Sequence, residues 1–167
     1  ARRDVADLRA ALDELDAQQA HLVLDRALGR YTLESVLSWV VLPYLKDLGD
    51  RWERGEASVA QEHFASNLLR GRLLALARGW GRGGGPAALL ACAPGEYHDL
   101  PLIMFGLALR ARGWRIVYLG ADTPTSSIAE AAAEVRPALI AVSAIRADAL
   151  ASERDALAAI AREFRVG

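Results

Sequence analysis

The sequence predicts an α/β protein in which a bundle of four helices precedes a parallel sheet covered by helices. Apolar residues recur at intervals of three and four through the first 80 positions. A glycine-rich run follows, and short apolar strands then alternate with amphipathic helical segments. We therefore expect a helical domain at residues 1–79, a linker at residues 80–86 and a sheet domain at residues 87–167.

The helical domain is expected to hold four amphipathic segments. The first two cover residues 4–15 and 17–28, and Gly29 ends the second. Thr32 and Ser58 are suited to cap a third and a fourth helix, and Pro43 predicts a kink in the third. The expected buried faces are Leu37, Val40, Val41, Tyr44, Leu45, Leu48 and Trp52 in the third helix, and Val59, Phe64, Leu68, Leu73 and Leu76 in the fourth.

The sheet domain is expected to contain strands at residues 87–93, 115–120 and 138–144, with helices between them. Such a βαβαβα series forms a flavodoxin-like (Rossmann-like) parallel sheet, which binds ligands beyond the carboxyl ends of its strands. A sheet of this kind normally has about five strands. We therefore expect the sheet to be truncated at the C-terminus of this chain.

Composition and charge argue against a nucleic-acid-binding, a disulfide-rich and a membrane-spanning chain. A net charge of −1 gives no basic excess to neutralise a nucleic-acid backbone, so DNA is expected to be bound only through a domain absent from this chain. Cys92, the single cysteine, excludes a disulfide framework or a cysteine zinc site and favours a cytoplasmic location. There is no apolar stretch of about 18 residues to span a membrane. A start at Ala1, without Met or a signal segment, indicates a fragment of a longer protein.

The loop after the first strand carries the strongest candidate for a metal ligand. It contains Gly95, Glu96 and His98, and a neutral imidazole binds transition metals well. Glu96 or Asp99 could orient the second ring nitrogen. On position alone, however, a histidine in such a loop is more often a helix-capping or surface residue.

The other two strands deliver small and polar residues to the same edge. Gly120 permits close backbone approach, and Asp122 or Thr123 could line a ligand or simply cap the next helix. Ser143 ends the third strand, where its hydroxyl could donate to a bound ring nitrogen or satisfy the backbone.

In the helical domain, Trp52 closes the third helix, while Glu62 and His63 lie in the first turns of the fourth. They could face a common cavity. Adjacent helical residues are about 100° apart, so at most one of Glu62 and His63 points squarely at the core. The alternative is a core tryptophan and two solvated polar side chains.

Taken together, these residues resemble the cobalamin-binding regions of MerR-type photoreceptor transcriptional regulators, the CarH/LitR family. Trp52, nine residues and then Glu62-His63 are similar to the family's W-x9-E-H signature, and Glu96-Tyr97-His98 to its E-x-H loop. The resemblance implies that His98 is the lower axial ligand of cobalt, with the displaced nucleotide tail beside Ser143. It also implies that Trp52, Glu62 and His63 contact an upper group such as 5′-deoxyadenosyl. Gly95 and Gly120 would leave room for the tail.

The sequence departs from the family pattern at two positions. Pro101 stands where the loop usually has a glycine, and Glu53 stands where light-sensing members carry a histidine after the tryptophan. A Gly-Gly segment later in the family's sheet has no counterpart before Gly167. These departures call into question the loop geometry and a photoproduct with two histidine ligands.

Two functions compete. The first is a sensory module in which light cleaves the cobalt–carbon bond of adenosylcobalamin and changes homo-oligomerisation, and thereby a DNA-binding domain. The alternative is a corrinoid carrier protein of a methyltransferase system, whose members usually have D-x-H-x-x-G, so Glu96 and Pro101 count against it. A degenerate domain that binds nothing is a third reading. With no H-E-x-x-H and no G-x-S-x-G, we expect no enzyme.

Overall fold

The computed structural model describes residues 1–145 and 147–164. It divides into two compact units, Ala1–Arg72 and Leu73–Gly167, and the last three residues of the predicted sheet domain lie outside the described residues. None of the helices in the described part of the chain has both the length and the apolar character that a bilayer span requires.

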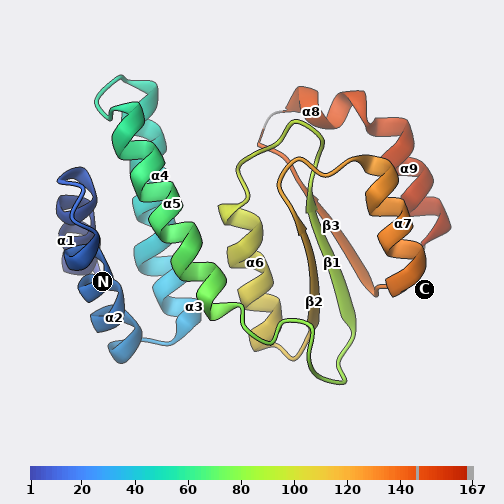
Figure 1. Cartoon of the computed structure of the whole chain (residues 1–167), viewed down its shortest axis with the longest axis horizontal. Coiled ribbons are helices and arrows are strands. Elements are labelled where there is room, and N and C mark those ends of the chain that lie inside the picture. The colour runs from blue at the N-terminus through green and yellow to red at the C-terminus, as the bar shows by residue number, and fades with distance from the viewer. Residues whose placement is uncertain (146, 165–167) are drawn as a thin grey trace. The chain divides into compact units, whose positions relative to one another are not determined.

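The first unit is helical, as predicted. Its elements are α1 (Arg2–Asp13), α2 (Ala17–Arg30), α3 (Leu33–Val36), the π-helical turn η1 (Leu37–Val41), α4 (Leu42–Glu53) and most of α5 (Val59–Leu76). Figure 1 shows that α3, η1 and α4 run on as one helix. We expected a kink at Pro43; the structure has the π turn η1 there, which ends at Val41, two residues before that proline.

Both predicted caps of this unit are formed. The Thr32 side chain accepts the N–H of Ser35 at 3.2 Å. Ser58 accepts the N–H of Gln61 at 3.2 Å, and the Gln61 side chain accepts the N–H of Ser58 at 3.0 Å. This reciprocal pair is a capping box, and it fixes where α5 begins.

The predicted buried faces are wrong at three of their ends. Leu37, Val40, Val41, Tyr44 and Leu48 are buried, but Trp52 is 53% exposed. In α5 the buried residues are Ala65, Leu69 and Leu73, one helical turn apart, whereas Val59 is 60% exposed and Leu76 is 38% exposed. Periodicity identifies residues that share a face, but it does not show how far along the helix a neighbouring element covers that face.

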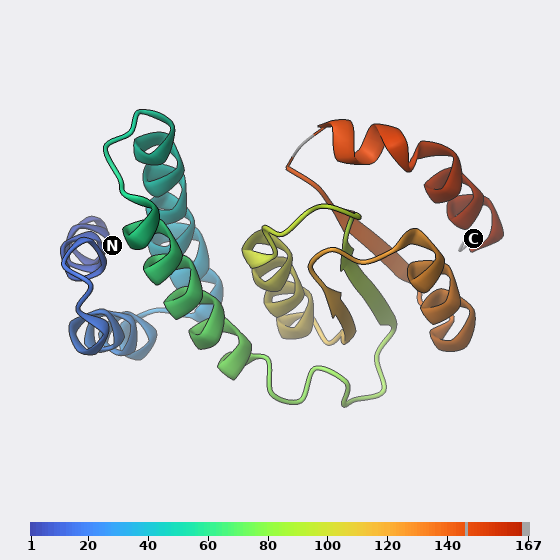
Figure 2. The same cartoon turned by 45° about the horizontal axis from the view of Figure 1, so that its top comes forward.

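The second unit is a three-layer α/β domain. Its elements are β1 (Ala87–Cys92), α6 (Leu100–Ala111), β2 (Arg115–Gly120), α7 (Thr125–Val135), β3 (Leu139–Ser143), α8 (Ala147–Ser152) and α9 (Arg154–Glu163). The three strands are parallel in the order β2-β1-β3. Figures 1 and 2 show α6 on one face of the sheet, and α7 and α9 on the other.

Successive side chains of the central strand β1 point to opposite faces of the sheet, so each face has its own core. Leu89 and Ala91 of β1 form a core cluster with Ile128 and Ala132 of α7 and with Ile160 of α9. Leu90 points to the opposite face, where it lies against Gly106 of α6. All of β1 is buried, as expected for a parallel strand covered on both sides.

Residues 80–86 contain no helix or strand; residues 81–84 are exposed, but Trp80 and Gly85 contact the sheet domain. The carbonyl of Trp80 accepts the N–H of Ile116 at 2.8 Å, and its ring makes an edge contact with Tyr118 at 5.5 Å between centroids. A Cβ on Gly85 would lie 1.9 Å from the Gly113 carbonyl oxygen, so only glycine fits there.

Candidate functional site

The loop between β1 and α6 presents a histidine whose ring is held by a buried carboxylate. Glu96 is only 2% exposed. Its Oε1 accepts the backbone N–H of His98 at 2.8 Å and lies 2.6 Å from His98 Nδ1. Its Oε2 accepts the N–H of Ile145, which follows β3, at 2.7 Å. One carboxylate therefore joins the loops after the two neighbouring strands β1 and β3.

The hydrogen bonds that Glu96 accepts lower its pKa and orient the His98 ring. Burial alone would raise the pKa of Glu96, but the N–H groups of His98 and Ile145 together with the His98 ring outweigh burial and lower that pKa. An ionised carboxylate can only accept hydrogen bonds, so Nδ1 of His98 donates. The Nε2 atom of a neutral ring then carries the free lone pair, and the side chain is 66% exposed. Glu96, and not Asp99, therefore orients the His98 ring.

Asp99, the other candidate for orienting His98, is buried and has a different partner. Its carboxylate accepts the hydroxyl of Tyr118 at 2.7 Å, which ties the start of α6 to β2. Asp99 is also the N-cap residue of α6, without a side-chain capping bond, and Pro101 occupies the first turn. A proline is well suited to that position because its missing N–H would have no partner in the helix.

One of the two predictions for Asp122 and Thr123 was that either residue caps the next helix. Neither residue does. The N-cap residue of α7 is Pro124. Instead, the Asp122 carboxylate accepts the N–H of Gly95 at 2.8 Å and the hydroxyl of Tyr97 at 3.1 Å. The hydroxyl of the buried Thr123 donates to the Gly120 carbonyl at 3.1 Å.

Gly120 and Ser143 end β2 and β3 at the same edge of the sheet. Gly120 has a φ of +96°, which glycine adopts at little cost. Ser143 pairs with Cys92 in the ladder, and its carbonyl accepts the N–H of Ala93 at 2.9 Å. The second unit thus brings one group of predicted site residues to its carboxyl edge: Gly95, Glu96, His98, Gly120, Asp122, Thr123 and Ser143.

The first unit carries the remaining three predicted residues. Trp52, near the end of α4, is exposed, which removes the reading of a core tryptophan. Glu62 accepts the hydroxyl of Ser66 at 2.7 Å, and its other oxygen lies 3.1 Å from Nδ1 of His63. The His63 side chain is 69% exposed. These side chains offer an aromatic face, a carboxylate and an imidazole to a ligand.

The sequence did not predict the roles of two residues, Tyr97 in the second unit and Arg51 in the first. Tyr97 lies inside the E-x-H motif, but a variable position gave no signal for its bond to Asp122. Arg51 precedes Trp52 and is 4% exposed. It binds Asp13 through both terminal nitrogens, at 3.0 and 3.1 Å, and Asp47 through Nε at 2.9 Å. The sequence did carry a sign that Arg51 is buried, because its spacing places it on the same helix face as Tyr44 and Leu48.

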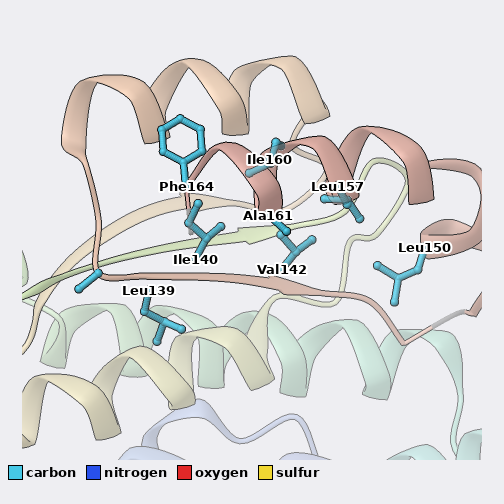
Figure 3. Close-up of a pocket in the computed structure, with 9 residues that line it drawn as sticks. Leu139, Ile140, Val142, Leu150, Leu157, Ile160, Ala161 and Phe164 are labelled. Atoms are coloured by element: carbon cyan, nitrogen blue, oxygen red, sulfur yellow. The ribbon is translucent and has the colours of Figure 1, made fainter. Parts of the chain in front are cut away.

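A pocket of about 420 Å³ lies along β3 and α9 (Figure 3). Its lining is apolar and extends the core cluster behind β1, with Ile140, Val142, Leu157, Ile160 and Phe164 among its residues. Ligand sites need a few placed polar groups to orient the ligand. The carboxyl edge with His98 is therefore the better candidate.

The donor set at that edge suits a metal that arrives with other ligands. Among the residues that the structure describes, none form a group of three or more His, Cys, Asp or Glu side chains around a common metal position. Zinc held by protein alone uses three or four such ligands. A single ordered imidazole instead fits a metal in a macrocycle, which needs one axial nitrogen. The residues present therefore fit a cobalt corrin.

Comparisons with known proteins agree with this chemistry. Residues 5–77 and residues 86–165 each match a family model described as a B12 binding domain. The chain is 36% identical over 141 residues to the HTH-type transcriptional repressor CarA of Myxococcus xanthus, covering 84% of the chain and 47% of the repressor. It is 34% identical over 136 residues to the repressor CarH of the same organism, covering 81% and 46%. The chain thus spans about half the length of these relatives.

Two solved structures also align with most of the chain. A cobalamin-binding protein from Desulfitobacterium hafniense DCB-2 aligns with a TM-score of 0.48 and 23% identity, covering 95% of this chain and 77% of that one. The methanol:cobalamin methyltransferase complex MtaBC from Methanosarcina barkeri aligns with a TM-score of 0.47 and 14% identity, covering 98% and 64%. With its two matched B12 binding domains and its likeness to CarA and CarH over most of its length, the chain belongs to the B12-binding family.

Proposed function

We propose that this cobalamin-binding module senses light through adenosylcobalamin and passes the signal to a transcriptional regulator. When bound, this cofactor supplies a cobalt–carbon bond that light can cleave. The observation that carries the proposal is the His98 ring, which Glu96 orders through Nδ1 while Nε2 remains free to bind a metal. The module itself catalyses no reaction in this proposal.

His98 would bind the cobalt in place of the cofactor's own base. Glu96 keeps the ring in the tautomer that binds metal through Nε2, and its charge makes that nitrogen a better donor. Gly95, Gly120 and Ser143 leave space for the displaced nucleotide tail, because their side chains are absent or small. Thr123 supports this edge through its hydrogen bond to Gly120.

The first unit would contact the adenosyl group of the cofactor. The exposed Trp52 ring would stack on the adenine, which has a π face. Glu62, held by Ser66, would accept hydrogen bonds from ribose hydroxyls, and His63 would add a polar contact. These contacts would make the affinity depend on the adenosyl group, so that its loss in light could act as a signal.

The output is a change in homo-oligomerisation. In this proposal the module works in the cytoplasm, and its association state alters DNA binding by a domain outside this chain. The support for this step is the likeness to two DNA-binding repressors. The ligand can shift the oligomeric equilibrium only by its difference in affinity for the two states.

The binding step is tested by absorbance spectra of the protein mixed with adenosylcobalamin in the dark. Wild type should show the base-off, histidine-on spectrum, and His98→Ala should lose it. His21→Ala, a variant of a histidine in the first unit, is the matched control and should keep it. A spectrum from His98→Ala identical to that of wild type would remove His98 as the ligand.

The sensory step is tested with green light. Illumination should change both the spectrum and the molar mass measured by light scattering after size-exclusion chromatography. If neither changes, light sensing is wrong. Tighter binding of methylcobalamin than of adenosylcobalamin would favour the competing function, a corrinoid carrier of a methyltransferase system.

A further inference from the structure

Asp122 contacts each of the three residues that precede His98. Its Oδ1 accepts the N–H of Gly95 at 2.8 Å, and its Oδ2 accepts the hydroxyl of Tyr97 at 3.1 Å. Its own N–H donates to the Glu96 carbonyl at 2.8 Å. A residue from the loop after β2 therefore holds a continuous stretch of the loop after β1.

The position of Asp122 is itself set by the sheet. The next residue, Thr123, donates its N–H to the carbonyl of Cys92 at 3.2 Å and its hydroxyl to that of Gly120 at 3.1 Å. These are the last residues of β1 and β2. Asp122 has a φ of +46°, in the left-handed region that Asn, Asp and Gly tolerate best. The strand ends thus place its carboxylate opposite Gly95 and Tyr97.

The bond from Tyr97 is not a by-product of side-chain packing. Its side chain is 68% exposed, so water could satisfy the hydroxyl at no cost. The hydroxyl nevertheless bonds to Asp122. This bond restrains Tyr97, the residue directly before His98. Glu96 in turn accepts the His98 N–H.

We propose that Asp122 and Tyr97 form a clasp that places the His98 loop in its cobalt-binding position before cobalamin arrives. This inference rests on the proposed function of His98. Glu96 orients the ring, whereas the clasp fixes the backbone that carries the ring. Both Asp122 oxygens bond to the His98 loop itself, so we assign Asp122 the role of a positioning residue.

The clasp raises affinity through preorganisation. If the loop occupies its binding conformation for only a fraction of the time, the apparent dissociation constant rises by the inverse of that fraction. Loss of an outer partner of a metal-bound histidine typically costs about 10- to 100-fold in affinity. We expect a loss near the lower end of this range, because Glu96 still holds the ring.

The test compares Asp122→Gly with Asp122→Asn in the full chain. Glycine tolerates the left-handed φ but lacks the carboxylate, whereas asparagine keeps both the φ and two polar atoms that can bond Gly95 and Tyr97. Asp122→Gly should bind adenosylcobalamin about tenfold more weakly, with a smaller histidine-on fraction at saturation. Asp122→Asn should restore most of both. Tyr97→Phe should cost about threefold, as expected for one hydrogen bond.

A second readout needs no cofactor. In the apo protein, the Gly95 amide should exchange with deuterium about tenfold faster in Asp122→Gly than in wild type, because its acceptor is gone. Asp155→Asn, on α9, is the matched control and should change neither exchange nor binding.

Unchanged Gly95 exchange together with wild-type affinity in Asp122→Gly would overturn the clasp. So would an Asp122→Asn variant as weak as Asp122→Gly. If wild type itself shows no histidine-on spectrum, the proposed function fails, and Gly95 exchange alone then decides whether the clasp holds the loop.

Discussion

The Oε1 atom of Glu96 lies 2.6 Å from Nδ1 of His98, and it also accepts the backbone N–H of that same residue. The carboxylate is buried, while the histidine side chain is mostly exposed. The orientation of the ring is therefore determined from inside the protein, and its free nitrogen is left to the ligand.

Replacement of Glu96 by glutamine should weaken cobalamin binding. The amide is neutral, so it supports the donor Nδ1 less well and presents an N–H to either His98 or the Ile145 amide. We expect about 10- to 100-fold lower affinity in absorbance titrations. Glu130→Gln, on an exposed position of α7, is the control. Equal affinities for the two variants would contradict the role of Glu96.

Replacement of Trp52 by alanine should reduce the preference for adenosylcobalamin over cyanocobalamin. An aromatic stacking contact contributes about 1 kcal/mol, which corresponds to a change of roughly fivefold in the affinity ratio. Trp39 is 54% exposed in the same unit, so Trp39→Ala is a matched control that should leave this ratio unchanged. Competition titrations measure it, and an equal ratio in Trp52→Ala and wild type would exclude Trp52 from the upper contact.

Replacement of Arg51 by methionine should destabilise the first unit. The change leaves Asp13 and Asp47 without the buried guanidinium that joins α1 to α4. Both carboxylates are partly exposed and can regain water, so we expect a loss of about 2 kcal/mol in the free energy of unfolding. Urea denaturation followed by circular dichroism measures it. The exposed Arg54, paired with Glu56, gives the control Arg54→Met, which should change stability far less than Arg51→Met, because solvent screens an exposed ion pair.

Cys92 makes the stability of the protein fall at alkaline pH. Burial, together with the charges of Asp99 and Glu96, raises the pKa of its thiol from 9.0 to about 11. Between these two values the thiol ionises in the unfolded chain but not in the folded one, so unfolding becomes easier as pH rises. Urea denaturation at several pH values should show this slope, and Cys92→Ala should reduce it. A slope unaffected by the substitution would show that another group is responsible.

Replacement of Gly106 by alanine should destabilise the second unit. A Cβ there would lie 2.9 Å from the Trp80 ring and 3.0 Å from Leu90, inside a closed core. Overpacking of this kind typically costs about 1–3 kcal/mol. Gly29→Ala is the control, because that helical glycine has open space around it and should gain up to about 1 kcal/mol. The same loss in both variants would point to a general intolerance of alanine.

Local features were predictable because their causes lie within a few residues. The strand at residues 115–120 and the caps at Thr32 and Ser58 were predicted at the positions where they occur. Position in a parallel sheet also placed His98 at the ligand-binding edge. The exposure of Trp52 was not predictable in this way, because it depends on where the covering helices end.

The sequence alone determined three things: the order of helices and strands, the location of His98 after the first strand, and the family to which the motifs point. Only the tertiary structure showed that Glu96 reaches the Ile145 amide 49 positions away, and that Asp122 holds Gly95 from a distance of 27 positions. These bonds exist because the order β2-β1-β3 places both other strands beside β1. Strand order arises from packing over the whole sheet, and no local pattern of residues encodes which two loops will meet.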